Sequence, residues 1–272
     1  MRAYCQSSKL SDGLNENARD ARHGFRLRGY EVLQYSVEQV YAGKFDDVLL
    51  NEKDDVIFYG GIGTIREAVR RAGRPAPPML DLPESLRAYF GRNVWEGTMG
   101  DVRRMVQDGV DLPVHMKPRD HHKLFTGKLV REFKDLIPSA HVDGKEPVLL
   151  QGLLEFVSEW RAYVLHGKIL NVGHYTGDPL LFPDPDVVRA GLSSFVDQPV
   201  ACSMDWGVAR DGETWLVECN AAYSLGNYSL NCLDYTAMIE AAWRELMGLE
   251  SPLGPGSPRS TRLPDEHAAV SV

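Results

Sequence analysis

Residues 203–220, SMDWGVARDGETWLVECN, constrain the fold more than any other part of the chain. Within them, Asp211 and Gly212 are typical of a tight turn between antiparallel strands, because both residue types tolerate a positive φ. The register that follows from a two-residue turn pairs Arg210 with Glu213, Trp206 with Val217, and Asp205 with Glu218. The segment therefore predicts a β-hairpin in which two carboxylates lie opposite each other.

Side chains alternate between the two faces of a strand, so this register predicts one apolar and one polar face. The apolar face, expected in the core, comprises Met204, Trp206, Val208, Trp215, Val217 and Cys219. The polar face comprises Ser203, Asp205, Gly207, Glu218 and Asn220. Because Gly207 has no side chain, it is expected to leave room for a ligand beside the carboxylates.

Like charges placed opposite each other normally destabilise a sheet. A cation shared by Asp205 and Glu218 removes this repulsion, and Asn220 adds an amide oxygen further along the strand. Such hard oxygen ligands suit Mg²⁺, which completes its octahedron with water and phosphate. The alternative is a solvated acidic face, but we favour a magnesium site formed by Asp205, Glu218 and Asn220.

The composition is that of a globular protein. The 272 residues are 43% hydrophobic and 25% charged, which is enough for two lobes with a sizeable core. The net charge of −8 disfavours a nucleic-acid partner. The 4 cysteines lack zinc-site spacing and are expected to be reduced core thiols. We find no signal-peptide pattern or membrane-length apolar run, and we expect a soluble, cytoplasmic protein without a membrane partner.

The N-terminal part of the chain alternates strand and helix patterns. Strands are expected at residues 2–6, 31–35 and 56–59, and helices at residues 14–27 and 64–72, which form a small βαβαβα unit. The glycine-rich turn at residues 60–63 lacks the full GxGxxG pattern and the P-loop lysine, so a tight crossover turn is favoured over a phosphate loop. Further helices are expected at residues 86–90 and 100–107.

Two lysines flank one loop in the middle of the chain. Lys117 lies in an expected strand at residues 114–118, and Lys123 lies in the polar loop that follows. Lysine is a point cation suited to phosphate oxygens, and surface lysines are the favoured alternative unless another part of the chain calls for a phosphate. The adjacent His121 and His122 point apart on an extended loop, so contact with solvent or substrate is expected rather than metal binding.

A second hairpin is expected around His166 and Gly167, with strands at residues 158–165 and 168–175. Its register places Glu159 and Arg161 on one face, where a simple ion pair between them is the alternative to a functional role. The preceding strand, residues 148–156, is interrupted at Gln151 and Gly152. Residues 183–199 are expected to be rich in loops, and residues 234–246 to form an amphipathic helix.

This order of parts resembles the ATP-grasp superfamily. The shared features are a small α/β lobe, a strand-end Lys, a Gly-closed loop with a second Lys, Glu-x-Arg on a strand, and Asp with Glu-x-Asn on a hairpin. Lys117, Lys123 and the sequence Ser158-Glu159-Trp160-Arg161 are most similar to its R2K clade. The resemblance covers about residues 110–248, and the first lobe is similar to the pre-ATP-grasp domain of the family.

The resemblance implies an α/β (α+β) protein with an ATP-grasp fold and an N-terminal Rossmann-like pre-ATP-grasp lobe. It places that lobe at residues 1–95 and the ATP-grasp domain at residues 96–250. Within this domain the lid spans about residues 110–150 and the metal-binding core about residues 151–250. Residues 251–272, rich in Pro, Ser and Gly, are expected to form a disordered tail.

The resemblance also implies roles for individual residues. Lys117 and Lys123 would hold the nucleotide phosphates, the hinge Gln151, Gly152 and Leu153 would face adenine, and Glu159 would reach the ribose. Asp205, Glu218 and Asn220 match the magnesium ligands of the family, and Arg161 would face the γ-phosphate as a catalytic cation. One departure is Ser203, which stands where many ligases carry an Arg, so Arg161 would supply the cation alone.

The implied activity is that of an ATP-dependent carboxylate-amine or carboxylate-thiol ligase, with ATP and Mg²⁺ as cofactors. Such an enzyme forms an acyl phosphate on a small molecule or peptide and passes it to an amine or thiol. The expected partners are these carboxylate and amine substrates, and a homodimer is left open. A kinase that phosphorylates a hydroxyl and a nucleotide-binding module without turnover remain alternatives.

Overall fold

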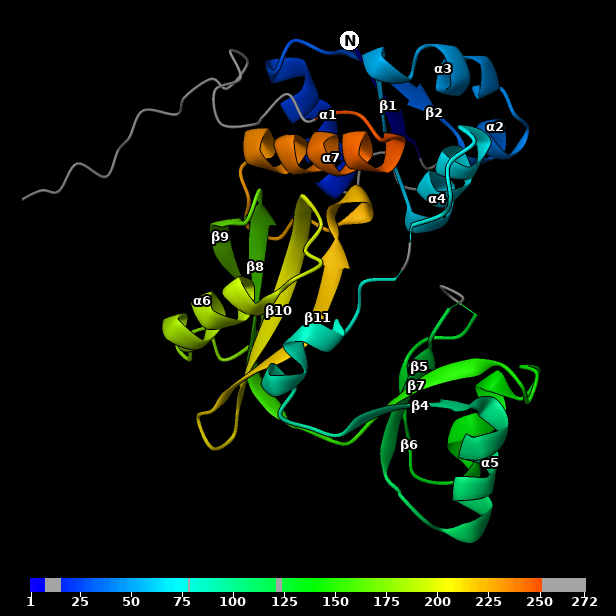
Figure 1. Cartoon of the computed structure of the whole chain (residues 1–272), viewed down its shortest axis with the longest axis vertical. Coiled ribbons are helices and arrows are strands. Elements are labelled where there is room, and N and C mark those ends of the chain that lie inside the picture. Colours follow the sequence, from blue (N-terminus) through cyan, green and yellow to red (C-terminus); the bar gives the residue numbers. More distant parts are fainter. Residues whose placement is uncertain (8–15, 78, 121–123, 251–272) are drawn as a thin grey trace, which may run out of the picture. The chain divides into compact units, whose positions relative to one another are not determined.

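A computed structural model describes residues 1–7, 16–77, 79–120 and 124–250. The chain forms two compact units. Their helices and strands are labelled in Figure 1. The first unit combines Met1–Pro75 with the segment that begins at Asn231, and the second unit comprises Ala76–Leu230. The domain boundaries expected from the sequence, after residues 95 and 250, stay a prediction. In the part of the chain that the structure describes, no helix is both long and apolar enough to span a membrane.

The first unit is built on a three-stranded parallel sheet in the order β2-β1-β3. Its strands are β1 (Arg2–Gln6), β2 (Glu31–Tyr35) and β3 (Val56–Tyr59). The helices that follow them in the chain are α1 (Glu16–Leu27), α2 (Val37–Tyr41), α3 (Asp46–Asn51) and α4 (Ile62–Arg71). The predicted alternation of strands and helices is confirmed, and all four residues of β3 are buried, as its continuous apolar run predicts.

The C-terminal helix α7 (Cys232–Met247) belongs to the first unit and confirms the predicted amphipathic helix. A Cβ on Gly24 of α1 would lie 2.1 Å from the Cys232 carbonyl oxygen, so glycine is needed where these helices meet. The buried Glu240 forms an ion pair with Arg28 at the end of α1. Trp243 packs against Phe58 of β3, with ring centroids 5.4 Å apart. Helix α7 therefore completes the core of this unit.

The turn between β3 and α4 is closely packed. A Cβ on Gly60 would lie 2.5 Å from both Gln6 Oε1 and the Tyr35 hydroxyl. The Gly61 N–H donates to Gln6 Oε1 at 2.9 Å. These contacts fit the expected tight crossover turn.

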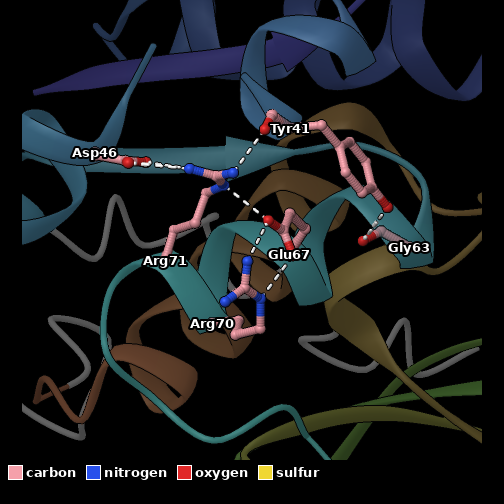
Figure 2. Close-up of polar contacts among 6 residues, drawn as sticks. All are labelled: Tyr41, Asp46, Gly63, Glu67, Arg70 and Arg71. Atoms are coloured by element: carbon pink, nitrogen blue, oxygen red, sulfur yellow. Dashed lines mark hydrogen bonds and ion pairs between the residues drawn. The ribbon is translucent and has the colours of Figure 1, made fainter. Parts of the chain in front are cut away.

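A polar network lies at the end of α4 (Figure 2). Arg71 donates to Glu67 at 2.7 Å, to Asp46 at 3.0 Å and to the Tyr41 carbonyl at 2.6 Å. Arg70 forms two further hydrogen bonds to Glu67, at 2.8 and 2.7 Å. This Arg71 network ties the segment around α2 and α3 to α4, and it brings two arginines to two carboxylates.

The second unit contains two four-stranded sheets. The β5 sheet has the order β4-β7-β5-β6, with strands β4 (Val94–Thr98), β7 (Pro147–Gln151), β5 (Val114–Pro118) and β6 (Lys128–Val130). Helix α5 (Met99–Asp108) shares a core with this sheet and begins at a capping box between Thr98 and Asp101. The helix expected at residues 100–107 is thus confirmed, whereas that at residues 86–90 is a short 3₁₀ helix, Glu84–Tyr89.

The β10 sheet is antiparallel and has the order β11-β10-β8-β9. Its strands are β8 (Phe156–Leu165), β9 (Lys168–Gly177), β10 (Ala201–Ala209) and β11 (Thr214–Ala221). Helix α6 (Pro185–Ser194) packs on it, and Gly191 lets the Trp206 ring approach, since a Cβ there would lie 2.4 Å from the ring. This helix corrects the loop-rich expectation for residues 183–199. Asp184 as N-cap and Pro185 at the first helical position are the missed signal.

The two hairpins of the β10 sheet differ in their agreement with the sequence. Between β8 and β9, His166 and Gly167 have φ of 49° and 70°, which confirms the predicted two-residue turn. Between β10 and β11, the Ala209 N–H donates to the Glu213 carbonyl, so the loop has three residues, 210–212. The predicted pairing of Arg210 with Glu213 is therefore wrong. The loop has one residue more than predicted, and Gly212 permits this geometry with its φ of 90°.

A β-bulge in β11 compensates for the longer loop. Trp206 lies opposite Leu216 rather than Val217, but beyond the bulge Asp205 lies opposite Glu218, as predicted. Leu216 consequently takes the core position expected for Val217. Met204, Trp206, Val208 and Cys219 are buried as expected, whereas Trp215 and Val217 are only partly buried, which corrects that expectation.

Candidate active site

A cavity of about 440 Å³ lies between the two sheets of the second unit, and its size is typical of a small-molecule site. The β5 sheet contributes Lys117 and Gln151 to its lining, and the β10 sheet contributes Glu159, Asp205 and Glu218. Gly152 and Leu153, which follow β7, line it as well. The structure thus brings together seven residues that the sequence predicted for one site.

Arg161 and Asp205 form a buried ion pair between the neighbouring strands β8 and β10. The Arg161 Nε donates to Oδ1 at 2.8 Å and Nη2 donates to Oδ2 at 2.6 Å. Burial raises the pKa of Asp205 although the guanidinium acts against it. Burial also opposes the charge on Arg161, but the Asp205 carboxylate keeps the pKa of Arg161 above its ordinary value. Arg161 therefore binds Asp205, not Glu159 as in the simple ion pair considered above.

Aromatic side chains hold the Arg161 guanidinium in place. Its central carbon lies 5.0 Å from the Tyr228 ring centroid and 5.6 Å from the Tyr175 ring centroid. Nη1 also lies 3.5 Å from the Gly226 carbonyl, and the Tyr163 hydroxyl accepts from the Tyr228 N–H at 2.9 Å. Arg161 is therefore fixed against Asp205 and Tyr175, which line the cavity, but it is not itself one of the lining residues. Its contact with a γ-phosphate stays a prediction.

The carboxylates of Glu159, Asp205 and Glu218 lie close enough for their charges to interact. Burial raises the pKa of Glu159, and the charges of Asp205 and Glu218 raise it further. The Asn220 amide nitrogen donates to Glu218 Oε1 at 3.0 Å and lies 3.4 Å from Asp205 Oδ2. This cluster of Glu159, Asp205, Glu218 and Asn220, here called the acidic cluster, would be stabilised by a bound cation.

The donor set of the acidic cluster fits Mg²⁺. In the described ranges, no three His, Cys, Asp or Glu side chains converge as a metal-binding group. Mg²⁺ commonly uses one or two carboxylates and completes its shell with water and phosphate, so it requires no such group. Asp205 can keep Arg161 and still offer a second lone pair, and a flip of the Asn220 amide would present its oxygen.

Lys117 is held by carboxylates on the cavity wall. Its Nζ forms an ion pair with Asp81 and lies 3.7 Å from Glu218 Oε2. The Asp81 carbonyl accepts from the Cys219 N–H at 2.6 Å, which joins this segment to the outer edge of β11. Burial raises the pKa of Asp81, and Lys117 opposes the shift. A phosphate at Lys117 would therefore take the place of Asp81 as its counter-ion.

The second lysine of the predicted site, Lys123, lies outside the described residues, as do His121 and His122. The interruption predicted at Gln151 and Gly152 is confirmed, because β7 ends at Gln151 and β8 begins at Phe156. The Gly152 N–H donates to the Asn93 carbonyl at 2.8 Å, which fixes the hinge.

The expectation that Gly207 leaves room for a ligand is wrong. A Cβ on Gly207 would lie 2.1 Å from the Phe156 ring, so this ring fills the space above the glycine. Phe156 itself lines the cavity. Gly207 thus shapes the site indirectly, because the absence of a side chain lets the Phe156 ring pack here as part of the cavity lining.

Two basic residues of the cavity lining were missed by sequence reasoning. His115 lies opposite Gln151, and burial, with Lys117 and Arg92 nearby, lowers its pKa. Its position two residues before Lys117 on one strand places both on one face, and this signal could have identified it. Arg92 also lines the cavity but lies in an irregular segment without a pattern.

The model of the ATP-grasp domain, R2K clade family 2, matches residues 89–238. The match spans more than half of the chain, and the protein therefore belongs to this family. The resemblance inferred from the sequence is confirmed. ATP and Mg²⁺, the cofactors expected from the sequence, are those of ATP-grasp enzymes.

Solved structures of ATP-grasp ligases have a similar fold. D-cycloserine synthetase DcsG is 16% identical, with a TM-score of 0.56 over 90% of this chain and 100% of that one. The ATP complex of D-alanine–D-alanine ligase from Bacillus anthracis is 14% identical, with a TM-score of 0.57 over 90% and 97%. The ADP complex of N5-carboxyaminoimidazole ribonucleotide synthetase is 9% identical, with a TM-score of 0.54 over 92% and 76%.

These similarities establish the predicted α/β ATP-grasp fold. No curated protein sequence matches the chain. The Rossmann-like character of the first unit stays a prediction.

Proposed function

We propose that the protein is an ATP-dependent carboxylate-amine or carboxylate-thiol ligase that forms an acyl phosphate on a small molecule or peptide. The observation that carries this proposal is a cavity that joins the hinge, Lys117 and the three carboxylates of the acidic cluster. Membership of the ATP-grasp family supports it.

Each residue predicted for the site has a role in this proposal. The hinge residues Gln151, Gly152 and Leu153 face the base, and Glu159 reaches the ribose. Lys117, together with Lys123, binds the phosphates, and Arg161 faces the γ-phosphate.

In this proposal the metal ion binds at the acidic cluster. Asp205, Glu218 and Asn220 would hold Mg²⁺, which neutralises phosphate charge and polarises the phosphoryl oxygens when bound. The two carboxylates are suited to this role because they face each other across neighbouring strands.

The proposed chemistry uses the protein for positioning and charge neutralisation rather than as a nucleophile. A carboxylate oxygen of the substrate attacks the γ-phosphorus, the bond to the bridging oxygen breaks, and ADP leaves. The amine or thiol then attacks the acyl carbon and inorganic phosphate leaves, while solvent takes the proton of the attacking group. Lys117 and Arg161 stabilise the transferred phosphoryl group.

A second candidate is a nucleotide-binding module without turnover. The bidentate Arg161–Asp205 pair favours it, because the guanidinium proposed to face the γ-phosphate is already bound to a carboxylate. Ser203, buried beside Asp205, adds no charge in its place.

Release of ADP from Mg²⁺-ATP, measured with pooled amino acids and amines, tests the proposal. A ligase sustains ADP release over many turnovers only when carboxylate and acceptor are both present, because the acceptor consumes the acyl phosphate, and mass spectrometry detects the new amide or thioester. Binding of an ATP analogue without ADP release identifies the inert module, and a phosphorylated product without an amide identifies a kinase. Absence of nucleotide binding refutes all three.

A further inference from the structure

Arg92 touches both sheets around the cavity. Its Nε donates to Gln151 Oε1 at 2.9 Å, at the end of β7. Nη1 donates to the Leu216 carbonyl and Nη2 donates to the Val217 carbonyl, both at 2.8 Å. Nη1 also donates to the Phe90 carbonyl at 2.8 Å, within its own segment. One guanidinium thus joins the hinge strand to β11.

The two carbonyls that Arg92 binds in β11 belong to the β-bulge. In a regular strand, successive carbonyl groups point to opposite edges, so a single side chain cannot bind both. Leu216 and Val217 present both carbonyls to Arg92 because the register shifts at this point, where Trp206 pairs with Leu216 and Asp205 with Glu218. Arg92 therefore satisfies carbonyl groups that the bulge withdraws from the regular ladder.

The segment around Arg92 is packed tightly against the bulged strand. Gly91 has φ 62°, and a Cβ there would lie 2.4 Å from the Trp215 ring. Arg92 also lies over the Phe156 ring, with 6.0 Å between the guanidinium carbon and the ring centroid. These contacts fix the backbone from which Arg92 extends.

We propose that Arg92 is a positioning residue, which holds the bulge at Leu216 and Val217 so that Glu218 faces Asp205 and which anchors this geometry on Gln151 of the hinge. The inference rests on the proposed function in one respect, namely that Glu218 binds Mg²⁺ with the nucleotide. An arginine is required because its planar fork reaches several acceptors in fixed directions, whereas a lysine ammonium does not.

The test compares Arg92→Lys with wild type in the full chain, with Arg87→Lys as the matched control. Arg87 is an exposed arginine that pairs with Glu84. Binding of a non-hydrolysable ATP analogue is measured by calorimetry, once with Mg²⁺ and once with EDTA. Arg92→Lys should weaken binding about 10- to 100-fold with Mg²⁺, as expected for loss of a partner that orients a metal ligand. Binding in EDTA should change about twofold or less, and Arg87→Lys should match wild type in both conditions.

Equal losses with and without Mg²⁺ would overturn the inference, because a general loosening of the fold affects both conditions alike. Gln151→Leu provides a second variant, which removes the anchor but keeps the cation and its bonds to the bulge. Because Gln151 is also proposed to face the base, this variant should weaken binding in both conditions, but the loss should be larger with Mg²⁺ than in EDTA. Equal losses in the two conditions would count against the proposed anchor.

Amide hydrogen exchange of residues 216–220 provides a readout without nucleotide. Arg92→Lys should speed exchange in this peptide and leave residues 168–175 of β9 unchanged. If wild type binds no nucleotide, the proposed function fails, but faster exchange confined to β11 still supports the positioning role. Unchanged exchange in β11 would overturn it.

Discussion

The Arg71 network and the Arg161–Asp205 pair are both centred on an arginine bound to carboxylates, yet they differ in burial. The Arg71 and Asp46 side chains are 19% and 44% exposed, whereas those of Arg161 and Asp205 are 7% and 2% exposed. The two groups also differ in charge balance. Hydrogen bonds from Arg70 lower the pKa of Glu67, while burial raises the pKa of Glu159 in the acidic cluster.

This difference separates a structural contact from a candidate site. The Arg71 network matches each carboxylate with at least one arginine and requires no ligand (Figure 2). The acidic cluster places three carboxylates on the wall of a cavity, where the charges of Asp205 and Glu218 help to raise the pKa of Glu159. Residual charge in a concave, partly buried place is a better indicator of function than an ion pair alone.

The largest expected effect comes from breaking the two groups in parallel. Asp205→Ala leaves a buried guanidinium unpaired and should lower the free energy of unfolding by about 3–5 kcal/mol. Glu67→Ala should cost much less, because solvent reaches the arginines that it leaves. Urea denaturation without nucleotide or metal measures the free energy of unfolding of both variants. Equal losses would contradict the proposed difference between the Arg161–Asp205 pair and the Arg71 network.

Arg161 variants should affect catalysis next most strongly. In a ligase, Arg161→Ala and Arg161→Lys should each lower kcat about a hundredfold while the ATP-analogue affinity stays within a few-fold, because a preorganised cation acts mainly on the transition state. Arg71→Lys serves as the control with normal kcat. Steady-state ADP release provides the measurement, after circular dichroism has established that each variant is folded. Undiminished turnover in both Arg161 variants would reduce Arg161 to a partner of Asp205.

A smaller effect is expected at Lys117. Lys117→Ala removes one charged contact to phosphate and should weaken binding of an ATP analogue about tenfold. Lys134→Ala, which breaks an exposed pair with Glu132, should leave the affinity unchanged. Calorimetric titration compares the two variants. Wild-type affinity in Lys117→Ala would mean that this lysine serves only Asp81 and Glu218.

The smallest effect concerns pH. Burial lowers the pKa of His115 below its ordinary value of 6.5, so the unfolded chain takes up a proton before the folded protein does. Stability from this group is therefore complete above about pH 6.5 and is lost as the pH falls through the folded-state pKa. Thermal unfolding should show wild type losing stability relative to His115→Gln on acidification. A difference in melting temperature between wild type and His115→Gln that stays constant from pH 7.5 to 5 would contradict the lowered pKa of His115.

Local patterns predicted much of the β10 sheet. The turn at His166 and Gly167 and the opposition of Asp205 and Glu218 follow from neighbouring residues, and both are observed. The predicted pairing between the turn and Asp205 was wrong, because the longer loop shifts the register by one residue and the bulge restores it only at Asp205. Such paired irregularities depend on contacts made from elsewhere, here from Arg92, and a hairpin sequence does not reveal them.

The contacts that complete the site are not local. Arg161 meets Asp205 because β8 and β10 are adjacent in the sheet, and helix α6 lies between these strands in sequence. Asp81 and Arg92 act from segments without strand or helix periodicity. Sequence patterns therefore identified site residues on strands, whereas the residues that pair with them could be identified only from the folded chain.

The place of α7 in the first unit has a consequence for biosynthesis. Residues of β3 emerge from the ribosome early, but Trp243, which packs on Phe58, follows only after the whole of residues 76–230. At about 5–20 residues per second, this interval lasts roughly ten seconds or longer. During translation the second unit can fold while the first still exposes apolar surface, so the first unit of a nascent chain is expected to need chaperone protection.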